Sequence, residues 1–128
     1  RAQALTGDRD ALDRALSGVG TAVGTRIDLA LWEAIDAVAG RDRREGADPV
    51  IVILTDGRPQ GGTEADIALA VATALELRVT MYAIGLGADV DPAVLLGIAG
   101  DRARVYLAPG PDDLAAVYRT IARVIPCR

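Results

Sequence analysis

The feature that most constrains the fold of this chain is the unbroken apolar run Val50-Ile51-Val52-Ile53-Leu54, which stops at Thr55-Asp56-Gly57. A strand with one solvent-exposed face alternates apolar and polar residues, whereas this run is apolar throughout. It therefore predicts a strand buried on both faces, as in parallel sheets. Residues 79–84, stopped by Gly85-Leu86-Gly87, and residues 103–107 predict two further strands.

Segments with helical spacing lie before, between and after these strands. They cover residues 8–16, 27–38, 63–75, 91–99 and 110–125. Alternation of strand and helix predicts right-handed crossovers and a parallel sheet covered on both faces. We therefore predict an α/β fold, a three-layer Rossmann-like sheet flanked by helices. Ligands of such sheets bind beyond the carboxyl ends of the strands, which directs attention to the loop that starts at Asp56.

Several helix ends carry recognisable signals. Thr63 with Asp66 resembles a capping box, and Asp91-Pro92 is typical of a helix start. Gly40 is a plausible stop for the helix over 27–38. The helix after Thr63 is expected to turn four apolar residues inward, namely Ile67, Val71, Ala74 and Leu75.

Composition excludes several classes of function. The chain has no His, its basic residues are all Arg, and its one cysteine is Cys127. A Ser-His-Asp triad, a Cys/His zinc site and a CxxC redox pair are therefore absent. A net charge of −4 and few aromatic residues argue against nucleic-acid binding, and no apolar run suits a membrane span. Cys127 is either an unpaired thiol or half of a disulfide with a partner outside this segment.

Four stretches, taken in order, resemble the von Willebrand factor A (VWA) family. Gly24-Thr25-Arg26-Ile27 resembles the family's Gly-Thr-x-Ile loop, and residues 50–57, VIVILTDG, resemble its fourth strand. Residues 79–87, VTMYAIGLG, resemble the fifth strand, and residues 95–121 resemble the sixth strand and closing helix. Each piece is weak alone, but the ordered set covers nearly the whole chain.

One family element is missing from the sequence. The family opens with a strand that ends in Asp-x-Ser-x-Ser, and the only serine here is Ser17. The resemblance therefore implies that residues 1–128 form a single partial VWA-like domain, incomplete at its N-terminus. In the family's sheet order the strand at 50–54 pairs with the absent first strand. Its hydrophobic edge is then exposed, so we expect the 128-residue piece to be poorly soluble or to self-associate.

The resemblance also implies a metal-ion-dependent adhesion site (MIDAS) that holds Mg²⁺ or Mn²⁺. Thr25 would supply a hydroxyl oxygen and Asp56 a carboxylate, both hard ligands that suit such cations. Two protein oxygens compete poorly with water, so binding is expected to be weak in this chain. Each residue also has a structural interpretation: Thr25 as the cap of a helix that starts at Arg26, and Asp56 as a turn former.

Other polar residues are less specific. Asp28 is expected in the first turn of its helix, complementing the helix dipole, or as a supporting group behind the metal site. Asp89 and Asp91 lack the spacing of a calcium loop, so Asp91 is interpreted as a helix cap. Gly61-Gly62-Thr63 could cradle a phosphate at a helix N-terminus, without a lysine to help. Trp32 is expected in the core.

The leading hypothesis is a non-enzymatic, metal-dependent protein-binding or adhesion module whose partner presents an acidic residue. The alternatives are a nucleotide- or phosphate-handling α/β enzyme domain, and a structural half-domain with no working site. No membrane insertion is expected in this segment. The family's adhesive members favour an extracellular or cell-surface location, with a cytoplasmic one as the alternative.

Overall fold

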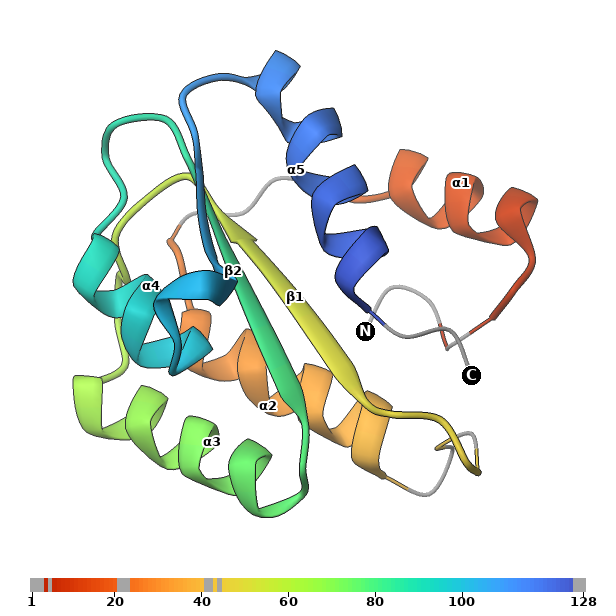
Figure 1. The fold of residues 1–128 in the computed structure, drawn as a ribbon, viewed down its shortest axis with the longest axis horizontal. Coiled ribbons are helices and arrows are strands. Elements are labelled where there is room, and N and C mark those ends of the chain that lie inside the picture. The colour runs from red at the N-terminus through yellow and green to blue at the C-terminus, as the bar shows by residue number, and fades with distance from the viewer. Residues whose placement is uncertain (1–3, 5, 21–23, 41–42, 44, 126–128) are drawn as a thin grey trace.

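The computed structural model describes residues 4, 6–20, 24–40, 43 and 45–125, and it shows an α/β fold (Figure 1). The elements follow the predicted order, with a short 3₁₀ helix added before the last strand. They are α1 (Arg9–Ser17), α2 (Ile27–Ala39), β1 (Val50–Thr55), α3 (Glu64–Glu76), β2 (Thr80–Leu86), α4 (Pro92–Ala99), η1 (Arg102–Arg104), β3 (Val105–Ala108) and α5 (Pro111–Val124).

The strands of the described chain form one parallel sheet in the order β1-β2-β3. Val50 of β1 pairs with Thr80 of β2, and Ala83 of β2 pairs with Val105 of β3. Because all the strands run the same way, their carboxyl ends lie at one edge. The loops that begin at Asp56 and Gly87 therefore leave the sheet on the same side, as the sequence predicted.

Helices cover both faces of the sheet, which gives three layers (Figure 1). The larger core lies under α2, α3 and α4, and its fully buried members include Leu31, Leu95 and Ile98. The smaller core lies between the sheet and α5, where Ile121 packs with Tyr82 and Ile84. The larger core thus supports both α2 and β1, the two elements next to the predicted metal donors.

Strand β1 is buried on one face only, which corrects the prediction of burial on both. Ile51 and Thr55 are buried at 6% and 8% exposure, whereas Val52 and Leu54 are 36% and 41% exposed. The reason is its position: β1 is an edge strand of the described sheet and pairs with β2 alone. The apolar run does form a strand, as predicted, but its second face is covered at Val50, which packs on the smaller core, and exposed at Val52 and Leu54.

Helix ends follow the predicted chemistry. The Asp66 carboxylate accepts from the Thr63 backbone N–H at 2.7 Å, and the Thr63 hydroxyl oxygen accepts from the Asp66 N–H at 3.2 Å. Asp91 caps α4 by accepting from the Ala93 N–H at 2.9 Å. Helix α2 ends at Ala39, and a Cβ on its C-cap residue Gly40 would lie 2.2 Å from the carbonyl oxygen of Asp36. Only glycine fits that position.

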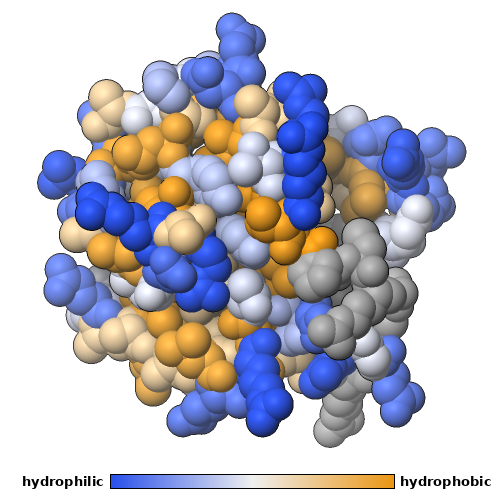
Figure 2. All heavy atoms as spheres, in the orientation of Figure 1, coloured by the Kyte–Doolittle hydropathy of each residue, from blue (hydrophilic) through white to orange (hydrophobic). Residues whose placement is uncertain are grey.

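Some apolar side chains are more exposed than the sequence suggested. Leu75 of α3 is 57% exposed, so its inward placement is wrong, and Trp32 is 37% exposed rather than in the core. Helix α1 has no buried residue, and its Leu16 is 71% exposed. The space-filling view shows apolar side chains reaching the surface at several places on the viewed face (Figure 2).

Cys127 lies outside the described residues, so its pairing stays a prediction. Among the helices described, none is long and apolar enough to cross a membrane.

Candidate metal-binding loops

Thr25 lies in the short loop before α2, and its hydroxyl does not cap that helix. Helix α2 begins at Ile27, and its N-cap residue Arg26 makes no side-chain capping hydrogen bond. The interpretation of Thr25 as the cap of a helix starting at Arg26 is therefore wrong. The side chain of Thr25 is half-buried and remains a candidate oxygen donor.

Asp56 follows β1 directly and is exposed. The side-chain hydrogen bonds of the turn are made by the residue before it: the Thr55 hydroxyl donates to the Gly57 carbonyl oxygen at 3.1 Å and accepts from the Gly57 N–H at 3.4 Å. Thr55 thus does the turn-forming work that was one interpretation of Asp56. The Asp56 carboxylate is held at the carboxyl edge of the sheet by a turn that it does not itself build.

The loop of Thr25 and the loop of Asp56 lie against each other. The Gln60 N–H donates to the Thr25 carbonyl oxygen at 2.8 Å. A Cβ built on Gly57 would lie 3.8 Å from the Thr25 hydroxyl oxygen. Since Gly57 is the immediate neighbour of Asp56, the structure brings both predicted donors to adjoining loops.

A bidentate ion pair fastens the start of α2 beside these donors. Arg26 donates through Nε to Asp28 Oδ1 at 2.9 Å and through Nη2 to Oδ2 at 2.7 Å. The Asp28 side chain is only 6% exposed, whereas that of Arg26 is 47% exposed. The hydrogen bonds from Arg26 lower the pKa of the Asp28 carboxyl, and the same pairing raises the pKa of Arg26. The carboxylate is therefore kept charged although it is removed from water.

Two glycines of the Asp56 loop pack directly on this ion pair. A Cβ at Gly61 would lie 3.0 Å from Arg26 Cδ, and a Cβ at Gly62 would lie 2.7 Å from the Asp28 carboxyl carbon. Both glycines also have positive φ, at +94° and +74°, where other residues are strained. Hence Gly57 and Gly61 face residues of the Thr25 loop, Gly62 faces the first turn of α2, and glycine lets the two segments approach.

Sequence reasoning missed this ion pair. The sequence predicts that Asp28 complements the helix dipole or supports the metal site, and it does not predict Arg26 as its partner. A signal was present, because Arg26 and Asp28 are two residues apart at a helix start and a Gly-Gly pair follows the next strand. What the sequence cannot give is that the second loop returns onto the first.

The other candidate sites find less support. The Asp28 carboxylate lies 2.7–2.9 Å from the Cβ position of Gly62 and is paired with Arg26 beside Gly61. The cation next to the proposed phosphate cradle is therefore already bonded to a carboxylate. Asp91 acts as a helix cap. Among the described residues, no group of three or more acidic, Cys or His side chains could hold a metal ion. Thr25 and Asp56 carry hydroxyl and carboxylate oxygens, the ligand types that hard cations prefer, and their role as metal ligands stays a prediction.

A parallel α/β sheet with oxygen donors on loops at its carboxyl edge defines a class of domains that bind ligands at that edge. The family model of the von Willebrand factor type A domain matches residues 7–120. The chain belongs to this family, as the motifs at 24–27, 50–57 and 79–87 predicted.

Curated relatives and solved structures agree with the assignment. Human matrilin-1 is 40% identical over 83 residues, which are 64% of this chain and 16% of matrilin-1. Bovine matrilin-1 is also 40% identical over 83 residues, which are 14% of that protein. The chain thus spans about a sixth of the length of these relatives.

Two solved structures share the fold. The von Willebrand factor type A structure from Catenulispora acidiphila superposes with a TM-score of 0.77 at 27% identity, covering 94% of this chain and 28% of that one. Proximal thread matrix protein 1 from the mussel byssus, solved with a zinc-occupied MIDAS motif, gives a TM-score of 0.75 at 21% identity. It covers 91% of this chain and 29% of that chain. At that identity the second likeness shows the fold alone.

Proposed function

We propose that this chain is a non-enzymatic protein-binding module of adhesive type, in which Thr25 and Asp56 help to hold a divalent cation, Mg²⁺ or Mn²⁺. The observation that carries the proposal is the joining of the two donor loops at the carboxyl edge of the sheet, through the Gln60–Thr25 hydrogen bond. A bound cation would supply a positive centre that an acidic side chain of a partner protein can ligate. The zinc-occupied site of the mussel byssus protein is a precedent in that protein.

The residues of this chain have separate parts in the proposed site. Thr25 offers a hydroxyl and Asp56 a carboxylate, the Gln60–Thr25 hydrogen bond joins the two loops, and Gly61 and Gly62 pack on the Arg26–Asp28 pair. With few protein ligands, the affinity for the cation is weak in this chain and an acidic ligand has room to bind. Matrilin-1 and a byssus matrix protein are among the proteins it resembles, which favours an extracellular or cell-surface location.

The enzyme alternative is weaker on a specific observation. A phosphate-handling loop needs backbone N–H groups and positive charge at the glycines. Here the cation beside Gly61, Arg26, is paired with both oxygens of the Asp28 carboxylate, which itself lies against Gly62, and the chain has neither Lys nor His. The half-domain alternative predicts no working site, so that neither a cation nor a cation-dependent partner would bind.

Paramagnetic broadening by Mn²⁺ tests the proposal, because it detects weak binding residue by residue. In ¹⁵N NMR spectra of the chain, Mn²⁺ should first broaden the amides of residues 24–28 and those of residues 56–58 and 60. Asp56→Asn should abolish this local effect and Thr25→Val should reduce it. Glu76→Gln, at the opposite end of α3 from the capping loop, is the matched control and should change nothing. Broadening that spreads over acidic surfaces and survives Asp56→Asn would reject the proposed site.

A further inference from the structure

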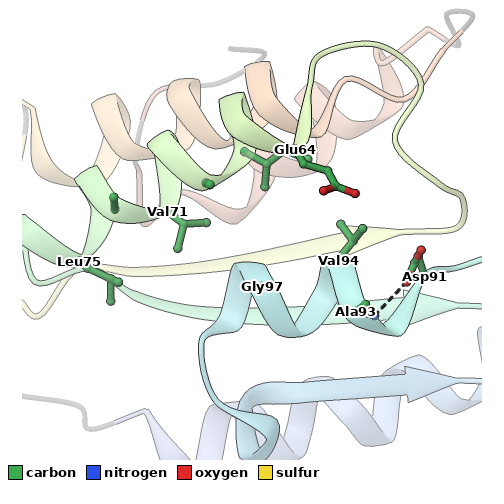
Figure 3. Close-up of a pocket in the computed structure, with 10 residues that line it drawn as sticks. Glu64, Val71, Leu75, Asp91, Ala93, Val94 and Gly97 are labelled. Atoms are coloured by element: carbon green, nitrogen blue, oxygen red, sulfur yellow. Dashed lines mark hydrogen bonds between the residues drawn. The ribbon is translucent and has the colours of Figure 1, made fainter.

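A groove separate from the metal-donor loops runs between α3 and α4 (Figure 3). Its volume is about 500 Å³, within the range of about 300–1,000 Å³ that is common for ligand sites. Its lining residues come from α3, among them Ile67, Val71 and Leu75, and from α4 and its cap, among them Val94, Gly97 and Asp91. Most of these residues are apolar.

The groove is shallow along its sides because several residues of α3 and α4 that line it are small. Ala68, Ala72, Ala93 and Gly97 are all exposed, so a ligand can enter from the side while attached to a larger body. Ile67 and Val71, each 9% exposed, form the apolar base. The groove therefore suits an extended aliphatic chain that lies along it.

Gly97 is the residue of this groove that the fold itself does not explain. It lies inside α4, where glycine costs about 0.5–1 kcal/mol relative to alanine. Nothing lies within 4 Å of the position its Cβ would take, and its φ is not positive. No close packing within the described chain thus requires glycine here, and the backbone of α4 is left open to the groove.

Charge marks one end of the groove. Glu64 begins α3 and Asp91 caps α4, so both carboxylates lie at the helix N-termini (Figure 3). None of the described lining residues is basic, and the chain carries a net charge of −4. An apolar groove that ends in two carboxylates is complementary to a side chain with an aliphatic stem and a cationic end group.

We propose that the α3–α4 groove binds a lysine or arginine side chain of a partner protein. The aliphatic stem would lie over Val71 and beside Gly97, and the cationic head would lie near Glu64 and Asp91. The open side over Ala68 and Ala72 leaves room for the partner's backbone. This site does not depend on the metal-binding proposal, because it shares none of its residues.

Two short peptides that differ by one charge test the groove. Acetyl-Ala-Arg-Ala-amide should shift the amide signals of residues 64–75 and 91–97 in NMR titrations. The same peptide with citrulline, which has nearly the same shape without the charge, should bind about tenfold more weakly, since one charge-assisted hydrogen bond is lost. Equal binding of the two peptides, or shifts located elsewhere, would overturn the proposal.

Variants separate the groove from the metal site. In Gly97→Leu the new side chain would occupy the groove without meeting a neighbouring residue. It should reduce arginine-peptide binding about tenfold, as expected when a main contact is lost. Glu64→Gln should weaken binding while leaving the Asp91 cap intact. Gly97→Ala is the control that shows whether a side chain at this position is compatible with folding. Asp56→Asn should leave peptide binding unchanged while it removes the Mn²⁺ broadening. Unaltered peptide binding in a folded Gly97→Leu protein would refute the assignment.

Discussion

Gln60 donates its backbone N–H to the carbonyl oxygen of Thr25 across 2.8 Å, and this bond joins the loop before α2 to the loop after β1. The contact is extended on one side by Gly57 beside the Thr25 hydroxyl, and on the other by Gly61 and Gly62 over the Arg26–Asp28 pair. The positions of both proposed metal donors therefore depend on residues that ligate nothing. Substitutions at this joint, meaning the contact between the two loops, should therefore change the proposed metal site without removing a donor atom.

Gly62→Ala tests this joint. The new Cβ would meet the Asp28 carboxylate at 2.7–2.9 Å, and the residue would keep a φ of +74°. The carboxylate cannot move aside easily because Arg26 holds both its oxygens. We expect lower thermal stability and weaker Mn²⁺ broadening at residues 24–28, measured by calorimetry and by NMR.

Gly87→Ala is the matched control for backbone strain. Gly87 has a φ of +80°, but nothing lies within 4 Å of its Cβ position. Alanine there should cost about 1 kcal/mol, the strain of a left-handed residue alone. If Gly62→Ala destabilises the protein no more than Gly87→Ala does, the close packing of Gly62 on Asp28 contributes nothing.

The capping box of α3 predicts a pH dependence of stability. Hydrogen bonds from the backbone and hydroxyl of Thr63 lower the pKa of the Asp66 carboxyl in the folded state. A lowered folded pKa means that the stabilisation is present above the unfolded value of about 4 and is lost as pH falls through the folded pKa. The difference in Tm between the native chain and Asp66→Ala should thus be large at pH 7 and shrink in acid. A Tm difference that stays constant down to pH 2.5 would contradict a stabilising role for the charged Asp66 carboxylate.

The sequence was sufficient for the elements and their order, and insufficient for contacts between loops. Capping signals at Thr63 and Asp91 and the stop at Gly40 are local, so they predict helix ends directly. Thr25 and Asp56 could be placed on the same edge because parallel strands share their carboxyl ends. The Arg26–Asp28 pair under Gly62 depends on how two distant loops meet, which no local pattern encodes. The exposure of Val52 likewise depends on which strands are present beside β1.

The free edge of β1 predicts self-association of the 128-residue chain. Val52 and Leu54 are 36% and 41% exposed on an edge strand, and such edges pair with other chains. Sedimentation velocity over a concentration series should show association, and Leu54→Lys should reduce it because a charge on an edge strand opposes pairing. Leu69→Lys is the control, since Leu69 is 61% exposed on α3. An equal effect of both variants would assign the association to general surface hydrophobicity, and a cooperatively folding monomer would remove the need for a partner strand.

Two glycines of the α4 region should respond to alanine in opposite directions. Gly97 faces open space inside a helix, so Gly97→Ala should raise the free energy of unfolding by about 0.5–1 kcal/mol through helix propensity. Gly85 lies in β2, where a Cβ would meet Leu95 Cδ1 at 2.8 Å and Val90 Cγ2 at 2.9 Å. Overpacking there should lower the same quantity by about 1–3 kcal/mol. Denaturant titration of both variants measures the change in the free energy of unfolding. A destabilising Gly97→Ala would contradict the open space that the structure places around Gly97.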